Sequence, residues 1–179
     1  SLSSMFTGAD LMLSNQGFSA SPTSADFNRG FVFTDRNSLD AAITAWIADE
    51  AAATTTYGHI NTWDVRAITD FSGLFNGHTS FNSDISNWDV SSGTNFGYMF
   101  GSAAAFNQDI GNWDVSSGNS FVYMFNSADA FNQDIGSWDV SSGSDFEGMF
   151  LEARAFNQDI GDWDVRSGTN FRLMFSGGF

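Results

Sequence analysis

FNQDIGNWDVSSGNSFVYMFNSADA, residues 106–130, recurs along the chain with a period of 25 residues. Related stretches begin at Phe81, Phe131 and Phe156, and a more divergent copy spans residues 57–80, which makes five copies. A unit of this length cannot bury an apolar face alone and has to stack on its neighbours. The repeat therefore predicts an elongated stack of similar units.

Within each unit the apolar residues change their spacing. In W-D-V, residues 113–115 for example, they alternate with period two, which predicts a short strand with Trp and Val inward and Asp outward. From Phe121 to Phe125 the spacing is three and four, which predicts one turn of α- or 3₁₀-helix. Together they predict an α/β repeat solenoid of the leucine-rich-repeat type. We expect a parallel β-sheet on one face and short helical or 3₁₀ turns on the other.

The residues before the repeats predict a cap for the stack. Residues 37–54 place apolar residues on one helical face after a candidate N-cap, Asn37. We expect a capping helix over about 37–54 that covers the first unit. The chain then divides into residues 1–56, an N-terminal connection with this helix, and residues 57–179, the five repeats.

The two ends of the sequence suggest continuation. Residues 1–9, SLSSMFTGA, resemble the M-F-x-x-A end of a unit, which suggests another array upstream. The sequence stops at Phe179 without a polar cap, although the ends of repeat stacks need caps. We expect either that more repeats follow or that this end docks on another chain.

Acid dominates the charge of the chain. Six Lys and Arg stand against 21 Asp and Glu, which gives a formal net charge of −15. A field of this sign repels phosphate backbones and anionic headgroups, so we expect no nucleic-acid partner. No apolar run is long enough for direct membrane insertion, and the absence of Cys excludes disulfides and thiolate metal sites.

One set of acids recurs as the Asp of each W-D-V. Its members are Asp64, Asp89, Asp114, Asp139 and Asp164. Stacked strands would place these carboxylates about 4.8 Å apart, where they repel one another. Each carboxylate either accepts hydrogen bonds from the V-S-S turn that follows, or helps the column to bind divalent cations or a basic or polyhydroxylated partner.

A second set of acids belongs to the N-x-D-I step of the repeat. Its members are Asp84, Asp109, Asp134 and Asp159, each two residues after an Asn. Asn columns can bond from unit to unit, and Asn and Asp also stabilise turns. Carboxylate, amide and main-chain oxygens are the ligands that calcium prefers, so Ca²⁺ is the candidate cofactor, although no EF-hand or nonapeptide calcium motif is present.

Signatures of catalysis are missing from the sequence. It holds no G-x-S-x-G, no Walker loop and no H-E-x-x-H. A hydrolase that uses a pair of Asp is the remote alternative. A catalytic pair needs two unlike environments, however, which near-identical repeats do not readily supply. The repeated Trp residues are expected in the core with Val.

The motifs F-N-Q-D-I-G-x-W-D-V-S-S and F-x-x-M-F, with the A-x-A-F-N-Q-D junction, closely resemble those of the BspA-type leucine-rich-repeat surface proteins of bacteria and protists. The resemblance covers residues 57–179 and extends upstream, since residues 33–65 resemble the segment that introduces such arrays. One departure is Gly93 with Phe96, and its equivalents, where the family usually has Val and Met. A smaller residue beside a larger one conserves volume.

The resemblance and the acidity together imply an extracellular location at the cell surface. We expect a non-enzymatic fragment of a surface protein that acts in adhesion or interaction, with a protein or glycan surface as partner. The alternative is a structural protein whose copies stack end to end into a filament or surface layer.

Overall fold

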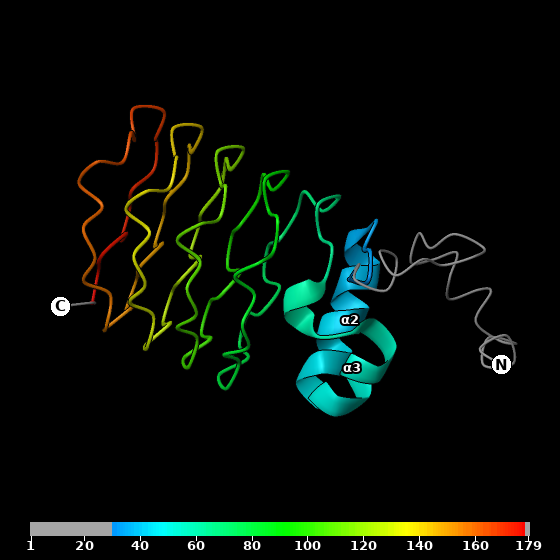
Figure 1. Ribbon diagram of the computed structural model, residues 1–179. Helices are drawn as coiled ribbons and strands as arrows, with labels where there is room; N and C mark the ends of the chain where they lie inside the picture. Colours follow the sequence, from blue (N-terminus) through cyan, green and yellow to red (C-terminus); the bar gives the residue numbers. More distant parts are fainter. Residues whose placement is uncertain (1–29, 178–179) are drawn as a thin grey trace, which may run out of the picture.

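The computed structural model describes residues 30–177. Two helices, α2 (Arg36–Ala48) and α3 (Glu50–Tyr57), and the short 3₁₀ helix η3 (Ile60–Thr62) come first. A stack of similar coils follows, one behind another along a common axis (Figure 1). The expectations for the N-terminal connection and for both ends of the sequence lie outside the described residues.

Two helices stand where one capping helix was expected over about 37–54. The N-cap of α2 is Asp35, not Asn37, because the Asp35 carboxylate accepts the N–H three residues on at 2.9 Å. Asp49 then ends α2 and caps α3 in the same way, at 3.0 Å. An Asp side chain that bonds the backbone locally competes with helix continuation, so the helical segment breaks there.

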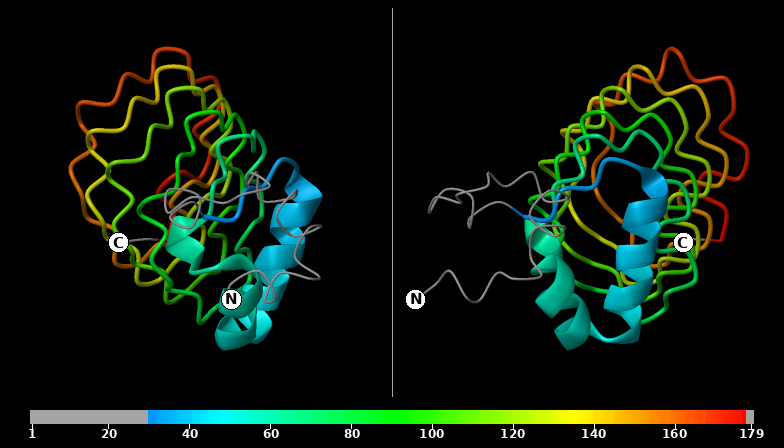
Figure 2. Two further views of the ribbon diagram at one scale, coloured as in Figure 1. Left: turned by 45° about the vertical axis from the view of Figure 1, so that its right-hand side comes forward. Right: turned by 90° about the vertical axis from the view of Figure 1, so that its right-hand side faces the viewer.

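The helices cover the N-terminal end of the stack (Figure 2). Leu39, Ile43 and Trp46 of α2 are buried against the first unit. The ring of Trp46 lies edge-on to that of Trp63, with centroids 5.8 Å apart. Its indole N–H donates to the Ser83 hydroxyl at 3.0 Å, so α2 is fixed by a directed contact as well as by apolar packing.

The expected parallel β-sheet, and with it the leucine-rich-repeat solenoid, is wrong for the described part of the chain. Residues 30–177 contain no β-strand, and successive coils share only isolated parallel bridges. These bridges join Asp70 with Asn95, Asn95 with Ser120, Ser120 with Asp145, and Asp145 with Asn170. The expected helical turns are absent too: residues 97–102 form a series of turns, and η3 is the one 3₁₀ helix in the described range.

The F-x-x-M-F segment explains why no sheet forms. Phe96, Tyr98 and Phe100 donate their N–H groups to carbonyls of the next coil at 2.8–2.9 Å, whereas Met99 donates back to Phe96 at 3.1 Å. Tyr98 has a φ of 56°, in the left-handed region. A strand needs consecutive extended residues, so left-handed residues and local turns leave only alternate N–H groups for the neighbouring coil.

The W-D-V segment shows the predicted alternation without strand pairing. Trp88 and Val90 are buried and Asp89 is exposed. Within residues 30–177, however, no main-chain hydrogen bond joins one W-D-V to the next. The indole makes the connection instead, since the Trp88 Nε1–H donates to the Ile60 carbonyl of the preceding coil at 2.8 Å. Period-two burial was therefore read correctly from the sequence, but it does not require a sheet.

Aromatic side chains run through the stack in columns. Phe71, Phe96, Phe121, Phe146 and Phe171 stack at centroid distances of 5.2–5.6 Å. Phe75, Phe100, Phe125, Phe150 and Phe175 stack at 5.5–5.7 Å. The Trp residues of the W-D-V motifs are at most 8% exposed, which confirms their predicted core position.

The Gly and Phe exchange has a steric basis. A Cβ on Gly93 would lie 2.5 Å from Cζ of Phe96, and the equivalent distances in the next three units are 2.5, 2.4 and 2.2 Å. The Phe ring thus fills the space that a side chain at the Gly position would need. The Gly and Phe positions therefore share one space in the core; the exchange of volume with the Val and Met of the resembling family stays a prediction.

Candidate functional site

The W-D-V aspartates form turns with their own units. Oδ1 of Asp89 accepts the Ser91 N–H at 3.1 Å and the Ser91 hydroxyl at 2.6 Å, and Asp114 holds Ser116 in the same way at 3.0 and 2.6 Å. Asp139 accepts the N–H two residues on at 3.0 Å. These contacts favour the local turn over ligand binding as the role of the column.

The two ends of this column pair with arginine. Arg66 and Arg166 reach Asp64 and Asp164, each with an Nη2 to Oδ2 distance of 2.6 Å. Hydrogen bonding from Arg166 lowers the pKa of Asp164 to about 2. Each carboxylate is therefore stabilised inside its own unit.

Repulsion along the column is outweighed. The Ser116 hydroxyl and N–H hold the pKa of Asp114 below its ordinary value, although the charge of Asp139 acts to raise it. The Ser141 hydroxyl and N–H likewise hold the pKa of Asp139 below its ordinary value. At Asp114 and Asp139 the hydrogen bonds to the charged form therefore exceed the repulsion from the neighbouring carboxylate.

The N-x-D-I aspartates also close turns. Asp84, Asp109, Asp134 and Asp159 each accept the N–H two residues on, at 2.9–3.0 Å. The preceding Asn forms a ladder between units: Asn82 Oδ1 accepts the Asn107 N–H at 2.9 Å and Gln108 Nε2–H at 3.0 Å. The bond from the Ser86 N–H lowers the pKa of Asp84.

Neither set of aspartates gathers into a metal site. Residues 30–177 hold no group of three or more His, Cys, Asp or Glu placed to bind one ion. In both sets Oδ1 faces the turn of its own unit, so equivalent carboxylates do not converge on a shared point. Binding of Ca²⁺ or of a partner at these columns stays a prediction.

A different surface position was missed from the sequence. The residue two after the first Phe of F-x-x-M-F has a left-handed backbone in all five units, with φ between 54° and 64°. The residues are Gly73, Tyr98, Tyr123, Gly148 and Leu173. Gly adopts this conformation freely, whereas Tyr or Leu costs roughly 1–2 kcal/mol. The available signal was that Gly and Tyr share one position of the repeat.

Tyr98 and Tyr123 stack on one another at the surface. Their ring centroids are 4.9 Å apart with planes 23° from parallel, and Tyr98 is 44% exposed. Tyr123 extends over the next unit, because a Cβ on Gly148 would lie 2.3 Å from its Cε1 atom. The absence of a side chain at Gly148 therefore makes room for the Tyr123 ring.

Glu147 ties this pair to the next two units. It accepts the Tyr123 hydroxyl at 3.1 Å, Nη1–H of Arg172 at 2.8 Å and Nδ2–H of Asn170 at 3.0 Å. The bonds from Asn170, Arg172 and Tyr123 lower the pKa of Glu147. We call Tyr98, Tyr123, Glu147 and Arg172 the tyrosine patch.

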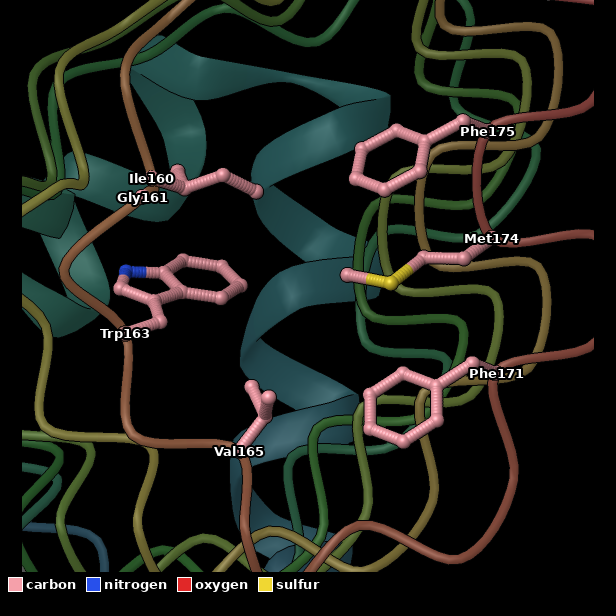
Figure 3. Close-up of a pocket in the computed structure, with 7 residues that line it drawn as sticks. All are labelled: Ile160, Gly161, Trp163, Val165, Phe171, Met174 and Phe175. Atoms are coloured by element: carbon pink, nitrogen blue, oxygen red, sulfur yellow. The ribbon is translucent and has the colours of Figure 1, made fainter.

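The last unit leaves an apolar hollow at the C-terminal end of the stack (Figure 3). It has a volume of about 340 Å³ and includes Val165, Phe171 and Phe175 in its lining. These three residues are 37–42% exposed, whereas their equivalents one unit earlier are buried. The hollow is therefore the face that the following unit covers elsewhere in the stack.

Comparison with known proteins places the repeats in a family. The family described as "Mycoplasma protein of unknown function, DUF285" matches residues 48–142 and, in a second match, residues 119–178. No curated protein and no solved structure matches the chain. Among the described residues no helix is long and apolar enough to cross a membrane. Because the two matches together span well over half of its length, the chain belongs to the DUF285 family.

Proposed function

We propose that the chain is a non-enzymatic interaction module of a surface protein, and that the tyrosine patch binds a protein or glycan surface. The observation that carries this proposal is the left-handed backbone of Tyr98 and Tyr123, at a position where two other units have Gly. Backbone strain of this kind costs of order 1–3 kcal/mol and concentrates in binding and catalytic sites. Tyrosine offers a large, rigid ring with a polar tip, which suits recognition.

The variation between units also supports the tyrosine patch as the binding surface. The Asp, Asn and Trp of the motifs recur because they close turns or join neighbouring coils. The residue preceding each left-handed position differs in all five units: Ser72, Gly97, Val122, Glu147 and Arg172. A constant scaffold with varied side chains on one surface is the arrangement by which repeat proteins bind partners.

The repeated environments also argue against the remote alternative, a hydrolase with an Asp pair. Asp89 and Asp114 make the same two contacts with Ser91 and Ser116. An acid and a base need different surroundings to hold their pKa values apart. The non-enzymatic proposal therefore fits the described aspartates better.

The proposed location is the outside of the cell, on a protein of the BspA type. The support is the likeness of the F-N-Q-D-I and W-D-V-S-S motifs to those surface proteins, together with a net charge of −15. The family match itself is to proteins of unknown function, so it leaves this proposal open to test.

The test is binding of the purified chain to a glycan array and to a panel of immobilised extracellular proteins. We expect a signal that Tyr98→Asn weakens at least about tenfold, since Asn tolerates the left-handed backbone but removes the ring. Ser102→Gly is the matched control, because Ser102 also has a left-handed φ, of 56°, and lies outside the patch. Undiminished binding by Tyr98→Asn, or no signal for the unmodified chain, would refute the proposal.

A further inference from the structure

Tyr98 is the most accessible of the oxidisable side chains that the structure describes. Among the Tyr, Trp and Met of residues 30–177 it alone is exposed, at 44%, whereas every Trp and Met in that range is at most 8% exposed. Tyr57 and Tyr123 are partly buried. A one-electron oxidant in solution therefore meets the ring of Tyr98 before these other groups.

Tyr123 lies directly behind this exposed ring. The two ring centroids are 4.9 Å apart, and the planes are 23° from parallel. The Tyr98 N–H donates to the Val122 carbonyl at 2.8 Å, so the main chains of the two units are bonded beside the rings. Two reactants held together in this way meet in a unimolecular step, which removes the entropic cost of an encounter in solution.

Glu147 provides the Tyr123 phenol with a proton acceptor. The hydroxyl donates to the carboxylate at 3.1 Å, and Arg172 and Asn170 hold that carboxylate at 2.8 and 3.0 Å. The bond to Glu147 raises the pKa of Tyr123, so the phenol keeps its proton at neutral pH. A phenol that loses an electron becomes a strong acid, and a base positioned at its O–H takes the proton in the same step. Tyr123 therefore loses an electron more easily than a phenol without such a base.

We propose that Tyr98 and Tyr123 are an oxidative cross-linking site, at which a one-electron oxidant joins the two rings into dityrosine. Tyr98 loses the first electron and its phenolic proton. The stacked Tyr123 then returns an electron to Tyr98 and passes its own phenolic proton to Glu147, while Tyr98 regains a proton from water. A second oxidation at Tyr98 leaves one radical on each ring.

The bond that forms joins a Cε carbon of one ring to a Cε carbon of the other. Each of these carbons then loses its hydrogen as a proton while the oxygen of the same ring gains one, so both phenols are restored. With hydrogen peroxide as the oxidant and a haem peroxidase to divide it into one-electron steps, two phenols and one peroxide give one dityrosine and two water molecules.

The cross-link would join two successive units of the stack by a covalent bond. A bond of this kind restricts the unfolded chain, as a disulfide does, and so stabilises the folded one. The two tyrosines are 25 residues apart in the sequence, whereas the folded stack already holds their rings together. This inference does not depend on the binding role proposed for the tyrosine patch.

The test is treatment of the purified chain with a haem peroxidase and hydrogen peroxide, followed by dityrosine fluorescence and mass spectrometry of proteolytic fragments. The whole chain has three Tyr, so every possible pair can be identified. We expect a monomeric product that has lost two hydrogen atoms, with Tyr98 linked to Tyr123 and a yield independent of protein concentration. Dityrosine formed mainly between chains, or mainly through Tyr57, would overturn the proposal.

Tyr98→Phe and Tyr123→Phe keep the rings but cannot form the phenoxyl radical. Each should lower the yield of dityrosine at least about tenfold, because the pre-positioned pair is lost, whereas Tyr57→Phe is the matched control and should leave the yield unchanged. An undiminished yield in either of the first two variants would contradict the assignment. The cross-linked wild-type chain should also have a higher Tm than the untreated chain, a readout that needs no substitution.

Glu147→Gln tests the proton acceptor separately. The amide oxygen can still accept the Tyr123 hydroxyl but is a much weaker base. We expect the initial rate of cross-linking to fall at least about tenfold, since a positioned base typically contributes about 10²–10⁴-fold. An unchanged rate in a variant with the wild-type Tm would overturn the role given to Glu147.

Discussion

Gly118→Ala tests whether the Phe ring excludes a side chain at the Gly position of the repeat. A Cβ there would lie 2.5 Å from Cζ and 3.2 Å from Cε2 of Phe121, and 2.9 Å from the Val115 carbonyl oxygen. Real Cβ contacts essentially never fall below 3.0 Å, so the ring has to move. Phe121 is fully buried and stacked between Phe96 at 5.6 Å and Phe146 at 5.4 Å, which leaves it no free direction.

The expected loss of stability follows from this confinement. Overpacking of a filled core costs about 1–3 kcal/mol. We expect a value in the upper half of this range, because the ring cannot shift without disturbing two neighbouring units and the carbonyl contact is with backbone. Phe121→Met in the same chain shortens the obstructing group. The double variant should therefore lose less than the two single losses added together, with a coupling free energy of about 0.5–3 kcal/mol.

The assay is urea unfolding of the wild-type chain, the two single variants and the double variant, with free energies from the midpoint and slope. Gly161→Ala is the matched control, since a Cβ there meets only the Asp159 carboxylate oxygen, at 3.2 Å. A Gly118→Ala chain within about 0.5 kcal/mol of wild type would refute the steric reasoning, because substitutions away from tight contacts fall in that range. Strict additivity in the cycle would refute the pairing with Phe121.

Three further outcomes follow from the aspartate and asparagine contacts. Asp164 has a folded pKa of about 2, below its ordinary 3.8, so its stabilising pair with Arg166 is present above about pH 4 and is lost as the pH falls through 2. A carboxyl titration followed by NMR should show this midpoint, and Arg166→Ala should move it towards 3.8. Asn107→Ala removes the acceptor of the Asn132 N–H, so the free energy of unfolding should fall by about 1 kcal/mol, whereas Asn107→Asp keeps an acceptor. Removal of divalent cations with a chelator should leave the Tm unchanged, since described N–H groups close the aspartate turns; a lower Tm would reveal structural calcium.

The sequence predicted which side chains of the unit point inward. Trp88 and Val90 are buried around an exposed Asp89, as their period-two spacing required. The strand prediction failed because burial and strand pairing are separate properties: no main-chain hydrogen bond joins successive W-D-V segments in the described range, and their indoles bond the preceding coil instead. A pattern of apolar and polar residues does not predict the left-handed φ of Tyr98. Only the presence of Gly at the same position in Gly73 and Gly148 pointed to it.

The candidate site, like the fold, could be predicted from the sequence only in part. The regular spacing of the aspartates was visible in the sequence, but their roles depend on which way each carboxylate turns. A side chain with a fixed period can serve a ligand or its own backbone, and Asp114 makes its two close contacts with Ser116. The tyrosine patch was missed because its residues break the repeat instead of following it.

Residues that recur in every unit and residues that vary between units are expected to have different roles in this chain. A residue that recurs in every unit, such as the Asn of the ladder, makes the same contact each time and is needed to stack the units. A residue that departs from the repeat at a structural cost is not needed for stacking, because other units do without it. Tyr98 and Tyr123 meet this condition, since Gly73 and Gly148 hold the same backbone conformation without a side chain. The exposed Tyr98 ring, stacked on Tyr123 beside the Glu147–Arg172 ion pair, is therefore a surface suited to contact with a partner.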